Sequence, residues 1–359
     1  SVSMEVRKYS SLKFLGFPQS LKAMKEKKVI APVHVRIKPT NICNHDCWYC
    51  AYHVSALQLG GGMEYRDTMP REKMEEIADD LIEMNVKAVT FSGGGEPLLY
   101  KPLPGIIKKL SKGGIKVASL TNGSNLKGKM ADAFAKYGSW VRISLDGYDD
   151  ESYSKARGVK VGEFTRLINN MKDFSARNSD CVLGAVYIID KDNYKHIFDL
   201  CLKLKGIGVD HVKLSGVIVG NTEKAGNEYH LGIKSEIQKQ ITKAKTLSDK
   251  DFSIVDAYHD LDLRMWDKPY TNCPNILHCP VIGADSNVYT CHDKAYTDDG
   301  LMGSIKNTSF KSFWFSKENE KFVYTFDPSK NCKHHCVCHS KNLIVDEYLS
   351  TDEDHLPFL

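Results

Sequence analysis

Three cysteines stand within eight residues, Cys43, Cys47 and Cys50, in a C-x3-C-x2-C spacing. Thiolates are soft ligands that select iron–sulfur clusters, zinc or copper(I). A cubane [4Fe–4S] cluster normally takes four cysteines, so three local thiols predict a cluster with one iron open to another ligand. Zinc is the main alternative, although its structural sites usually combine a C-x2-C pair with a second pair or with histidines downstream.

The same spacing, with the aromatic Tyr49 directly before the last cysteine, resembles the radical S-adenosylmethionine (SAM) superfamily. In that family the open iron binds the amino and carboxylate groups of SAM. One electron from the cluster then cleaves SAM to methionine and a 5′-deoxyadenosyl radical. The resemblance therefore implies a SAM-binding [4Fe–4S] cluster and SAM as cofactors, with Tyr49 beside them. It also implies an electron donor, such as a flavodoxin or a ferredoxin, as a partner.

Polar and glycine-rich segments further along the chain extend the resemblance. Residues 92–97 resemble the family's Gly-Gly-Glu segment, whose backbone meets the amino group of SAM, and glycines let a backbone approach a ligand closely. The cofactor-binding candidates in this segment are Gly93, Gly94, Gly95 and Glu96. Ser144 and Asp146 resemble residues that bind the SAM ribose, and Arg157 resembles the arginine that pairs with the methionine carboxylate. Without a function, the glycine segment would be a flexible turn and Arg157 would be an ordinary surface residue.

Two other segments are candidates for the SAM pocket. Thr121 and Asn122 close a strand-like run. Residues 216–223 literally fit a G-x-I-x-G-x-x-E pattern that the family has near the adenine. They follow the sixth predicted strand, however, whereas the family places that pattern on the fifth. We therefore expect this region to face the adenine or the substrate.

A second group of six cysteines lies near the other end of the chain. Its members are Cys273, Cys279, Cys291, Cys332, Cys336 and Cys338. The group resembles the SPASM and Twitch domains, which hold auxiliary iron–sulfur clusters. Two fully ligated clusters would need eight thiols, so the simplest assignment is one auxiliary [4Fe–4S] cluster. Its expected ligands are Cys273, Cys279, Cys291 and Cys336, with Cys332 or Cys338 able to replace Cys336.

Cysteines left over from this cluster have other assignments. Cys332 and Cys338 are candidate hydrogen-atom donors to a substrate radical, and a second, incompletely ligated cluster is another reading. Alternation around residues 288–290 predicts a hairpin whose arms carry Cys279 and Cys291. A structural zinc site is the alternative for the whole group, because five histidines accompany it. They are His278, His292, His334, His335 and His339.

The elements that must position these residues alternate between strands and helices. Short β-branched or apolar runs predict six strands, at 33–38, 88–92, 116–120, 140–145, 182–189 and 211–218. Helical patterns lie between them, at 71–84, 103–112, 126–137, 161–176 and 193–205. Such an order requires parallel strands joined by crossover helices, in an open doubly wound sheet or a barrel. The resemblance implies a partial (β/α)6 TIM-like barrel, with its chemistry in the loops that follow the strands.

The α/β chain is expected to have five parts. They are a helical leader (1–32), the barrel (33–232), a bridging helix and strand (233–270), a small cysteine-rich α+β domain of the SPASM or Twitch type (271–345) and an acidic tail (346–359). The leader is expected to cover the bottom of the barrel.

Composition excludes several classes of protein. The 359 residues are 42% hydrophobic, as in an ordinary soluble protein. The apolar runs are too short to span a membrane, and no secretory signal is visible. A net charge of +4, without a basic stripe, does not indicate nucleic-acid binding. We therefore expect a cytoplasmic protein whose clustered thiols bind metal, while the lone Cys181 and Cys201 act as small buried hydrophobes.

The resemblance implies an enzyme that abstracts a hydrogen atom from its substrate. Oxidation follows if the auxiliary cluster accepts an electron, and epimerisation follows if a thiol returns a hydrogen atom. Because no leader-peptide-recognition domain is visible ahead of residue 33, we expect a small polar substrate such as a sugar or an aminoglycoside-like metabolite. The alternatives are a maturase of a ribosomally made peptide or protein, and a non-catalytic iron–sulfur or zinc protein.

Overall fold

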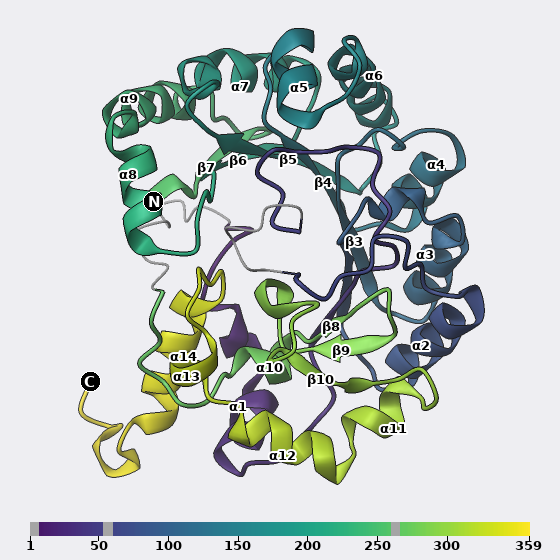
Figure 1. Ribbon diagram of the computed structural model, residues 1–359, viewed down its shortest axis with the longest axis vertical. Coiled ribbons are helices and arrows are strands. Elements are labelled where there is room, and N and C mark those ends of the chain that lie inside the picture. Colours follow the sequence, from purple (N-terminus) through teal and green to yellow (C-terminus); the bar gives the residue numbers. More distant parts are fainter. Residues whose placement is uncertain (1–6, 53–59, 260–265) are drawn as a thin grey trace.

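The computed structural model describes residues 7–52, 60–259 and 266–359, and within them one curved sheet of ten strands forms the centre (Figure 1). Seven neighbouring strands are parallel and follow chain order. They are β1 (His34–Ile37), β2 (Ala88–Phe91), β3 (Lys116–Thr121), β4 (Trp140–Leu145), β5 (Val182–Ile189), β6 (His211–Gly216) and β7 (Ser253–Asp256). The first six lie within the predicted runs or within one residue of them. The seventh, β7, extends the parallel sheet from the segment predicted to be a bridge.

Helices line the convex face of this sheet, whereas loops cross its concave side (Figure 1). They are α2 (Arg71–Glu83), α3 (Leu103–Lys112), α4 (Gly128–Tyr137), α5 (Asp150–Arg157), α6 (Glu163–Ser175), α7 (Ile197–Gly206), α8 (Glu223–Leu231) and α9 (Lys234–Lys245). The predicted partial barrel is therefore confirmed. One difference lies between β4 and β5, where the sequence predicted a single helix and the structure has both α5 and α6.

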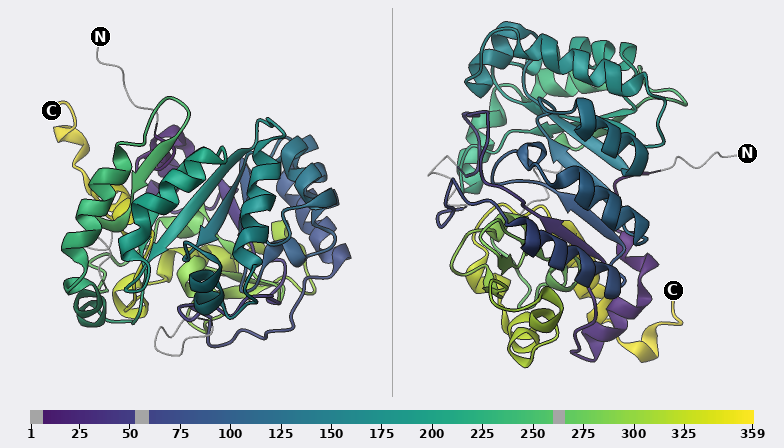
Figure 2. Two further views of the ribbon diagram at one scale, coloured as in Figure 1. Left: turned by 90° about the horizontal axis from the view of Figure 1, so that it is seen from above. Right: turned by 90° about the vertical axis from the view of Figure 1, so that its right-hand side faces the viewer.

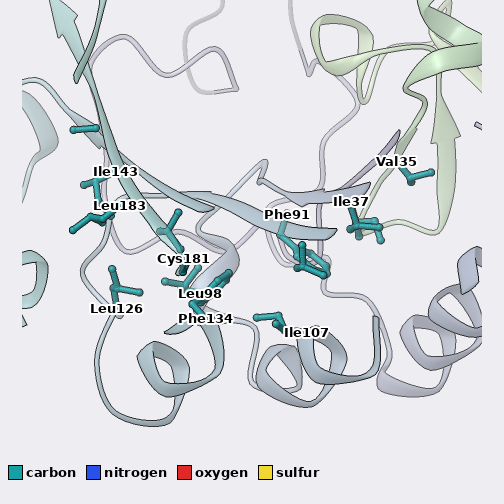
Figure 3. Close-up of a cluster of buried hydrophobic side chains, with 14 of the residues drawn as sticks. Val35, Ile37, Phe91, Leu98, Ile107, Leu126, Phe134, Ile143, Cys181 and Leu183 are labelled. Atoms are coloured by element: carbon teal, nitrogen blue, oxygen red, sulfur yellow. The ribbon is translucent and has the colours of Figure 1, made fainter. Parts of the chain in front are cut away.

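Apolar side chains between the strands and the outer helices form the core (Figure 3). Along β4, Val141, Ile143 and Leu145 are fully buried, while the residues between them are only partly buried, as period-two alternation requires. Each such side chain contributes about 1.5–3 kcal/mol when fully buried. Cys181 and Cys201 belong to this core, at 4% and 0% exposure, which confirms their prediction as small hydrophobes.

The cysteine-rich segment continues the same sheet. Strand β8 (Val281–Ile282) pairs antiparallel with β9 (Asn287–Tyr289), which confirms the predicted hairpin, although Cys279 and Cys291 flank its two strands and do not lie on them. Strand β9 also pairs with β10 (Leu301–Ser304). Strand β8 also pairs in parallel with β1, so the hairpin does not form a separate sheet. Five helices complete this segment. They are α10 (Asn275–His278), α11 (Phe310–Trp314), α12 (Lys317–Thr325), α13 (Pro328–Asn331) and α14 (His339–Ser350).

Helix α1 (Pro18–Lys25) of the leader and the carboxyl-terminal end of the chain lie on the outside of the barrel (Figure 2). The leader also contains a 3-10 turn (Lys13–Gly16). The hydroxyl of Tyr9 lies 2.8 Å from Nε2 of His211, the first residue of β6, and accepts a hydrogen bond from Arg142 in β4 (2.9 Å). The leader therefore contacts these two strands toward their amino-terminal ends. Helix α14 continues to Ser350, past the predicted start of the acidic tail. No described helix is long and apolar enough to cross a membrane.

Candidate active site

The three-cysteine loop follows β1 and is held on two sides by backbone hydrogen bonds. The N–H of Glu96, in the loop after β2, donates to the carbonyl of Ile42 (2.9 Å). On the other side, the N–H of Asp46 donates to the carbonyl of Arg157 at the end of α5 (2.8 Å). The loop therefore lies at the carboxyl ends of the strands, where barrel enzymes carry their chemistry.

The thiols of this loop are neighbours. Burial raises the pKa of Cys43, and it raises the pKa of Cys47 to about 12, partly opposed by the charge of Arg157. Cys43 and Cys50 both act electrostatically on Cys47. The protein by itself therefore keeps Cys43 and Cys47 protonated, and a metal would displace their protons on binding. Three adjacent thiols are a donor set that fits a cluster with three protein ligands.

The glycine loop after β2 packs directly on the segment that leads into Cys43. A Cβ atom at Gly95 would stand 2.1 Å from the carbonyl oxygen of Ile42, and one at Gly94 would stand 2.5 Å from Oδ1 of Asn41. Both distances are far inside van der Waals contact. Gly95 is therefore required by the close approach of two backbones, and Gly94 by the approach of the Asn41 side chain. These contacts bring the predicted SAM-binding segment beside the cysteine loop.

Replacing Gly95 by alanine should lower the free energy of unfolding by about 1–3 kcal/mol, because the backbone of Ile42 must move to admit the methyl group. Urea denaturation measures this change. Gly105 in α3 is the matched control, since a Cβ there meets nothing within 4 Å. Gly105→Ala should raise stability by about 0.5–1 kcal/mol. Equal stability of Gly95→Ala and the native chain would contradict the packing described here.

Glu96 joins the glycine loop to the end of β3. Its buried carboxylate accepts hydrogen bonds from the Thr121 hydroxyl, from the N–H of Asn122 (2.8 Å) and from the N–H of Leu98 (3.2 Å). Burial raises the pKa of Glu96, and these hydrogen bonds oppose the rise. The side-chain amide of Asn122 donates in turn to Asn44 in the cysteine loop (2.9 Å). Glu96, Thr121 and Asn122 therefore contact one another, and Glu96 and Asn122 each form a hydrogen bond with the segment that carries the cysteines.

A buried ion pair supports the other side of the cysteine loop. Nε of Arg157 donates to Oδ1 of Asp146 (2.9 Å), and the two residues are 3% and 2% exposed. Tyr49 donates its hydroxyl proton to the second oxygen of Asp146 (2.5 Å). Arg157 also donates to the carbonyl of Ser144 (2.8 Å) and lies 3.2 Å from Nδ1 of His45. Four predicted site residues, Tyr49, Ser144, Asp146 and Arg157, therefore lie in contact. The partner of the Arg157 guanidinium within the protein is the carboxylate of Asp146.

The segment predicted to face the adenine lies where the strand count placed it. Gly216 ends β6, and Glu223 begins α8. The carbonyl of Val217 lies 2.9 Å from Nε2 of the buried His230. The segment therefore follows the sixth strand, as the count indicated.

Asp190 and Asn193, after β5, are functional-site neighbours that the sequence prediction missed. Asn193 donates its side-chain amide to the carbonyl of Asp146 (2.8 Å) and to that of Ile188 (2.7 Å). One oxygen of Asp190 accepts from the N–H groups of Asp192 and Asn193 (2.8 and 2.9 Å). The Asp-x-x-Asn spacing directly after a strand could have indicated these residues, because Asp and Asn side chains often form hydrogen bonds with nearby backbone groups.

Asp190 should make stability depend on pH. Burial raises its pKa to about 6, so the folded chain holds a proton that the unfolded chain releases near pH 4. This contribution is fully present below about pH 4 and is lost as the pH rises to about 6. In Asp190→Asn, which keeps the accepting oxygen, that pH dependence should disappear. Urea unfolding of both chains from pH 4 to 7 measures it, and parallel curves would contradict the expectation.

Lys38 links the glycine loop to the cysteine-rich segment and was also missed. Its fully buried Nζ donates to the carbonyl of Gly93 (3.2 Å) and lies 3.1 Å from Nδ1 of His292, next to Cys291. It also lies 5.1 Å from the centre of the Tyr52 ring. Burial lowers the pKa of Lys38 well below its ordinary value, and the charge of Arg36 adds to the effect.

Five of the six downstream cysteines line one small cavity in the C-terminal part. Its lining includes Cys273, Cys291, Cys332, Cys336 and Cys338. Cys279 is an electrostatic neighbour of Cys338, and its Sγ atom lies 3.3 Å from Nδ1 of His34. A hydrogen bond from Cys336 lowers the pKa of Cys338 to about 7. Thiols are the ligands that iron–sulfur clusters take, so this donor set fits an auxiliary cluster, with Cys332, Cys336 and Cys338 all within its reach.

The histidines that the zinc alternative would use differ in their hydrogen bonds and in their distance from the cysteine cavity. Nδ1 of His339 lies 2.9 Å from the Tyr270 hydroxyl, and His334 is the histidine that lines the cavity. Neither ring nitrogen of His278 has a hydrogen-bond partner among the described residues. Across the described ranges, no three His, Cys, Asp or Glu side chains surround a point suited to a single metal ion.

Comparison with known proteins gives relatives that share part of this chain. A probable GTP 3′,8-cyclase of Sulfolobus acidocaldarius is 30% identical over 185 residues, 50% of this chain and 54% of its own length. An uncharacterized protein of Archaeoglobus fulgidus is 30% identical over 161 residues, 45% of this chain and 36% of its own length. The chain thus spans about half or less of the length of these relatives.

Solved structures share the fold over nearly the whole chain. Streptococcus suis SuiB bound to the precursor peptide SuiA matches with a TM-score of 0.62 and 17% identity, over 94% of this chain and 80% of that one. The enzyme anSMEcpe with bound AdoMet matches with a TM-score of 0.57 and 16% identity, over 91% of this chain and 98% of that one. At such identities the likeness concerns the fold.

The model of the "Radical SAM superfamily" matches residues 37–204. This range contains the three-cysteine loop, the glycine loop and the pair formed by Asp146 and Arg157. The cofactors of the superfamily, a [4Fe–4S] cluster and SAM, are those that the sequence predicted. Residues 37–204 of this chain therefore form a radical SAM domain.

Proposed function

We propose that this radical SAM enzyme is a maturase that modifies a peptide or protein substrate. The observation that carries the proposal is the extent of its fold likeness to SuiB, whose structure holds a precursor peptide. The matched 94% of this chain must include most of the cysteine-rich segment. The sequence favoured a small sugar-like substrate, but the comparisons favour the peptide alternative instead.

In this proposal Cys43, Cys47 and Cys50 hold the SAM-binding cluster, and the glycine loop offers its backbone to the amino group of SAM. Bound there, the cluster and SAM would supply the radical chemistry that removes a hydrogen atom from a substrate carbon. The protein supplies orientation and excludes side reactions. We assign a positioning role to Arg157 and Asp146, because they bond each other and Tyr49 and so fix the cysteine loop.

The downstream thiols complete the proposed site. At least one auxiliary [4Fe–4S] cluster would be held by Cys273, Cys279, Cys291 and one of Cys332, Cys336 and Cys338. Thiols left over would be hydrogen-atom donors. We keep the five-part division of the chain, with boundaries at residues 32, 232, 270 and 345, as part of the proposal, and a flavodoxin or a ferredoxin as the electron donor.

The experiment is anaerobic reconstitution followed by reduction in the presence of SAM. Formation of 5′-deoxyadenosine is then compared with and without mixed peptides, GTP, and a panel of sugars and aminocyclitols. We expect peptides to raise the rate, and peptides deuterated at carbon should transfer deuterium into 5′-deoxyadenosine. Stimulation by GTP or sugars alone would overturn the maturase assignment. No 5′-deoxyadenosine under any condition would instead favour a non-catalytic iron–sulfur or zinc protein.

A further inference from the structure

His34 in β1 contacts a cysteine that lies 245 residues further along the chain. Nδ1 of its ring lies 3.3 Å from Sγ of Cys279. Nε2, on the other side of the ring, lies 2.7 Å from Oγ1 of Thr90 in β2. Both ring nitrogens are therefore engaged, one by a neighbouring strand and one by a downstream thiol.

The separation of His34 and Cys279 is set by the sheet. The N–H of Arg36 donates to the carbonyl of Pro280 (3.0 Å), and the N–H of Lys38 donates to the carbonyl of Ile282 (2.9 Å). These bonds begin one residue after Cys279 and hold its segment alongside β1. The imidazole is thus presented to the sulfur by strand pairing, which is more rigid than a contact between two loops.

The direction of the hydrogen bond follows from the chemistry of the partners. A cysteine that binds metal is deprotonated, so its sulfur can only accept. A neutral imidazole has one N–H, and the other nitrogen accepts. Thr90 has a hydroxyl proton to donate to Nε2, which places the ring proton on Nδ1. The N–H of Nδ1 therefore points to Cys279 whether the ring is neutral or charged.

We propose that His34 is a positioning residue for the auxiliary cluster, in which its Nδ1–H hydrogen bond to Cys279 raises the reduction potential. This inference rests on the proposed function, because it assumes that Cys279 is a cluster ligand. Hydrogen bonds to ligand sulfurs withdraw electron density and stabilise the reduced cluster. His34 thus favours a cluster that accepts an electron, which is the property an oxidative reaction needs.

The test uses the full chain with Cys43, Cys47 and Cys50 all replaced by alanine, so that the auxiliary cluster alone gives the signal. The midpoint potential is measured by a redox titration followed by electron paramagnetic resonance. His34→Phe and His34→Met, which lack a donor, should both lower the potential. His34→Gln keeps an N–H donor and should stay closer to the parent value. His278→Phe is the control, because this residue precedes Cys279 yet has no hydrogen-bond partner in the described chain.

The outcomes separate the inference from the function on which it rests. About four irons per parent chain and an unchanged potential in the two donor-free variants would overturn the role of His34 alone. An equal fall in His278→Phe would also overturn it, since the change would then reflect general disturbance. A parent chain without iron would overturn the auxiliary cluster and the inference together. A lowered potential in His34→Phe and His34→Met, with recovery in His34→Gln, supports the proposal.

Discussion

Replacing Cys47 by alanine should abolish the formation of 5′-deoxyadenosine from SAM. Cys47 lies in the centre of the three-cysteine loop, and a cluster that has three protein ligands loses one of them. Iron content should fall by about four per chain, the content of one cubane. Chromatography of the reaction products and an iron assay measure the two effects after anaerobic reconstitution.

Cys201 provides the matched control for this substitution. It is a cysteine of the same size, fully buried in the core and far from either group of clustered thiols in the sequence. Cys201→Ala should leave iron content and SAM cleavage at the native level. If Cys47→Ala still cleaved SAM, the loop would not be the site of the cluster.

Replacing Asp146 by asparagine should lower the free energy of unfolding by about 3–5 kcal/mol, because the charge of Arg157 is then buried without a counter-charge. Asparagine keeps the shape of the side chain, so the loss of stability reflects the missing negative charge and not a new cavity. Urea denaturation of the cluster-free chain measures the change. The loop around Tyr49 loses an acceptor at the same time, which should also reduce cluster content.

An exposed ion pair gives the comparison. Arg166 and Glu163 lie 3.1 Å apart in α6, with exposed fractions of 65% and 27% for their side chains. Glu163→Gln should change the free energy of unfolding by no more than about 1 kcal/mol, since water and salt screen the pair. Losses of the same size in both variants would contradict the special role of the buried pair.

The sequence was sufficient for most of the barrel because each strand carries a local signal. In β4 and β5, apolar and β-branched runs fix the boundaries, and both agree with the prediction. Helix α5 was missed because its residues, DESYSKAR, have little apolar periodicity. A capping box between Asp149 and Ser152 marks its start and was the signal available.

The site was predicted less completely than the fold. Residue types and spacing located the cysteine and glycine loops, since both motifs are local. They did not reveal that Arg157 bonds Asp146, or that Lys38 and His34 reach the cysteine-rich segment. These contacts depend on which strands become neighbours. The pairing of β8 with β1 joins residues about 245 positions apart, and no local pattern records it.

That pairing also protects the chain from association with itself. In the parallel order β1 to β7, β1 would be the outermost strand, and its free N–H and C=O groups would be a template for another chain. The two residues of β8 occupy those groups. A chain cut after residue 270 would expose the edge, so loss of the cysteine-rich segment should promote aggregation as well as remove thiols.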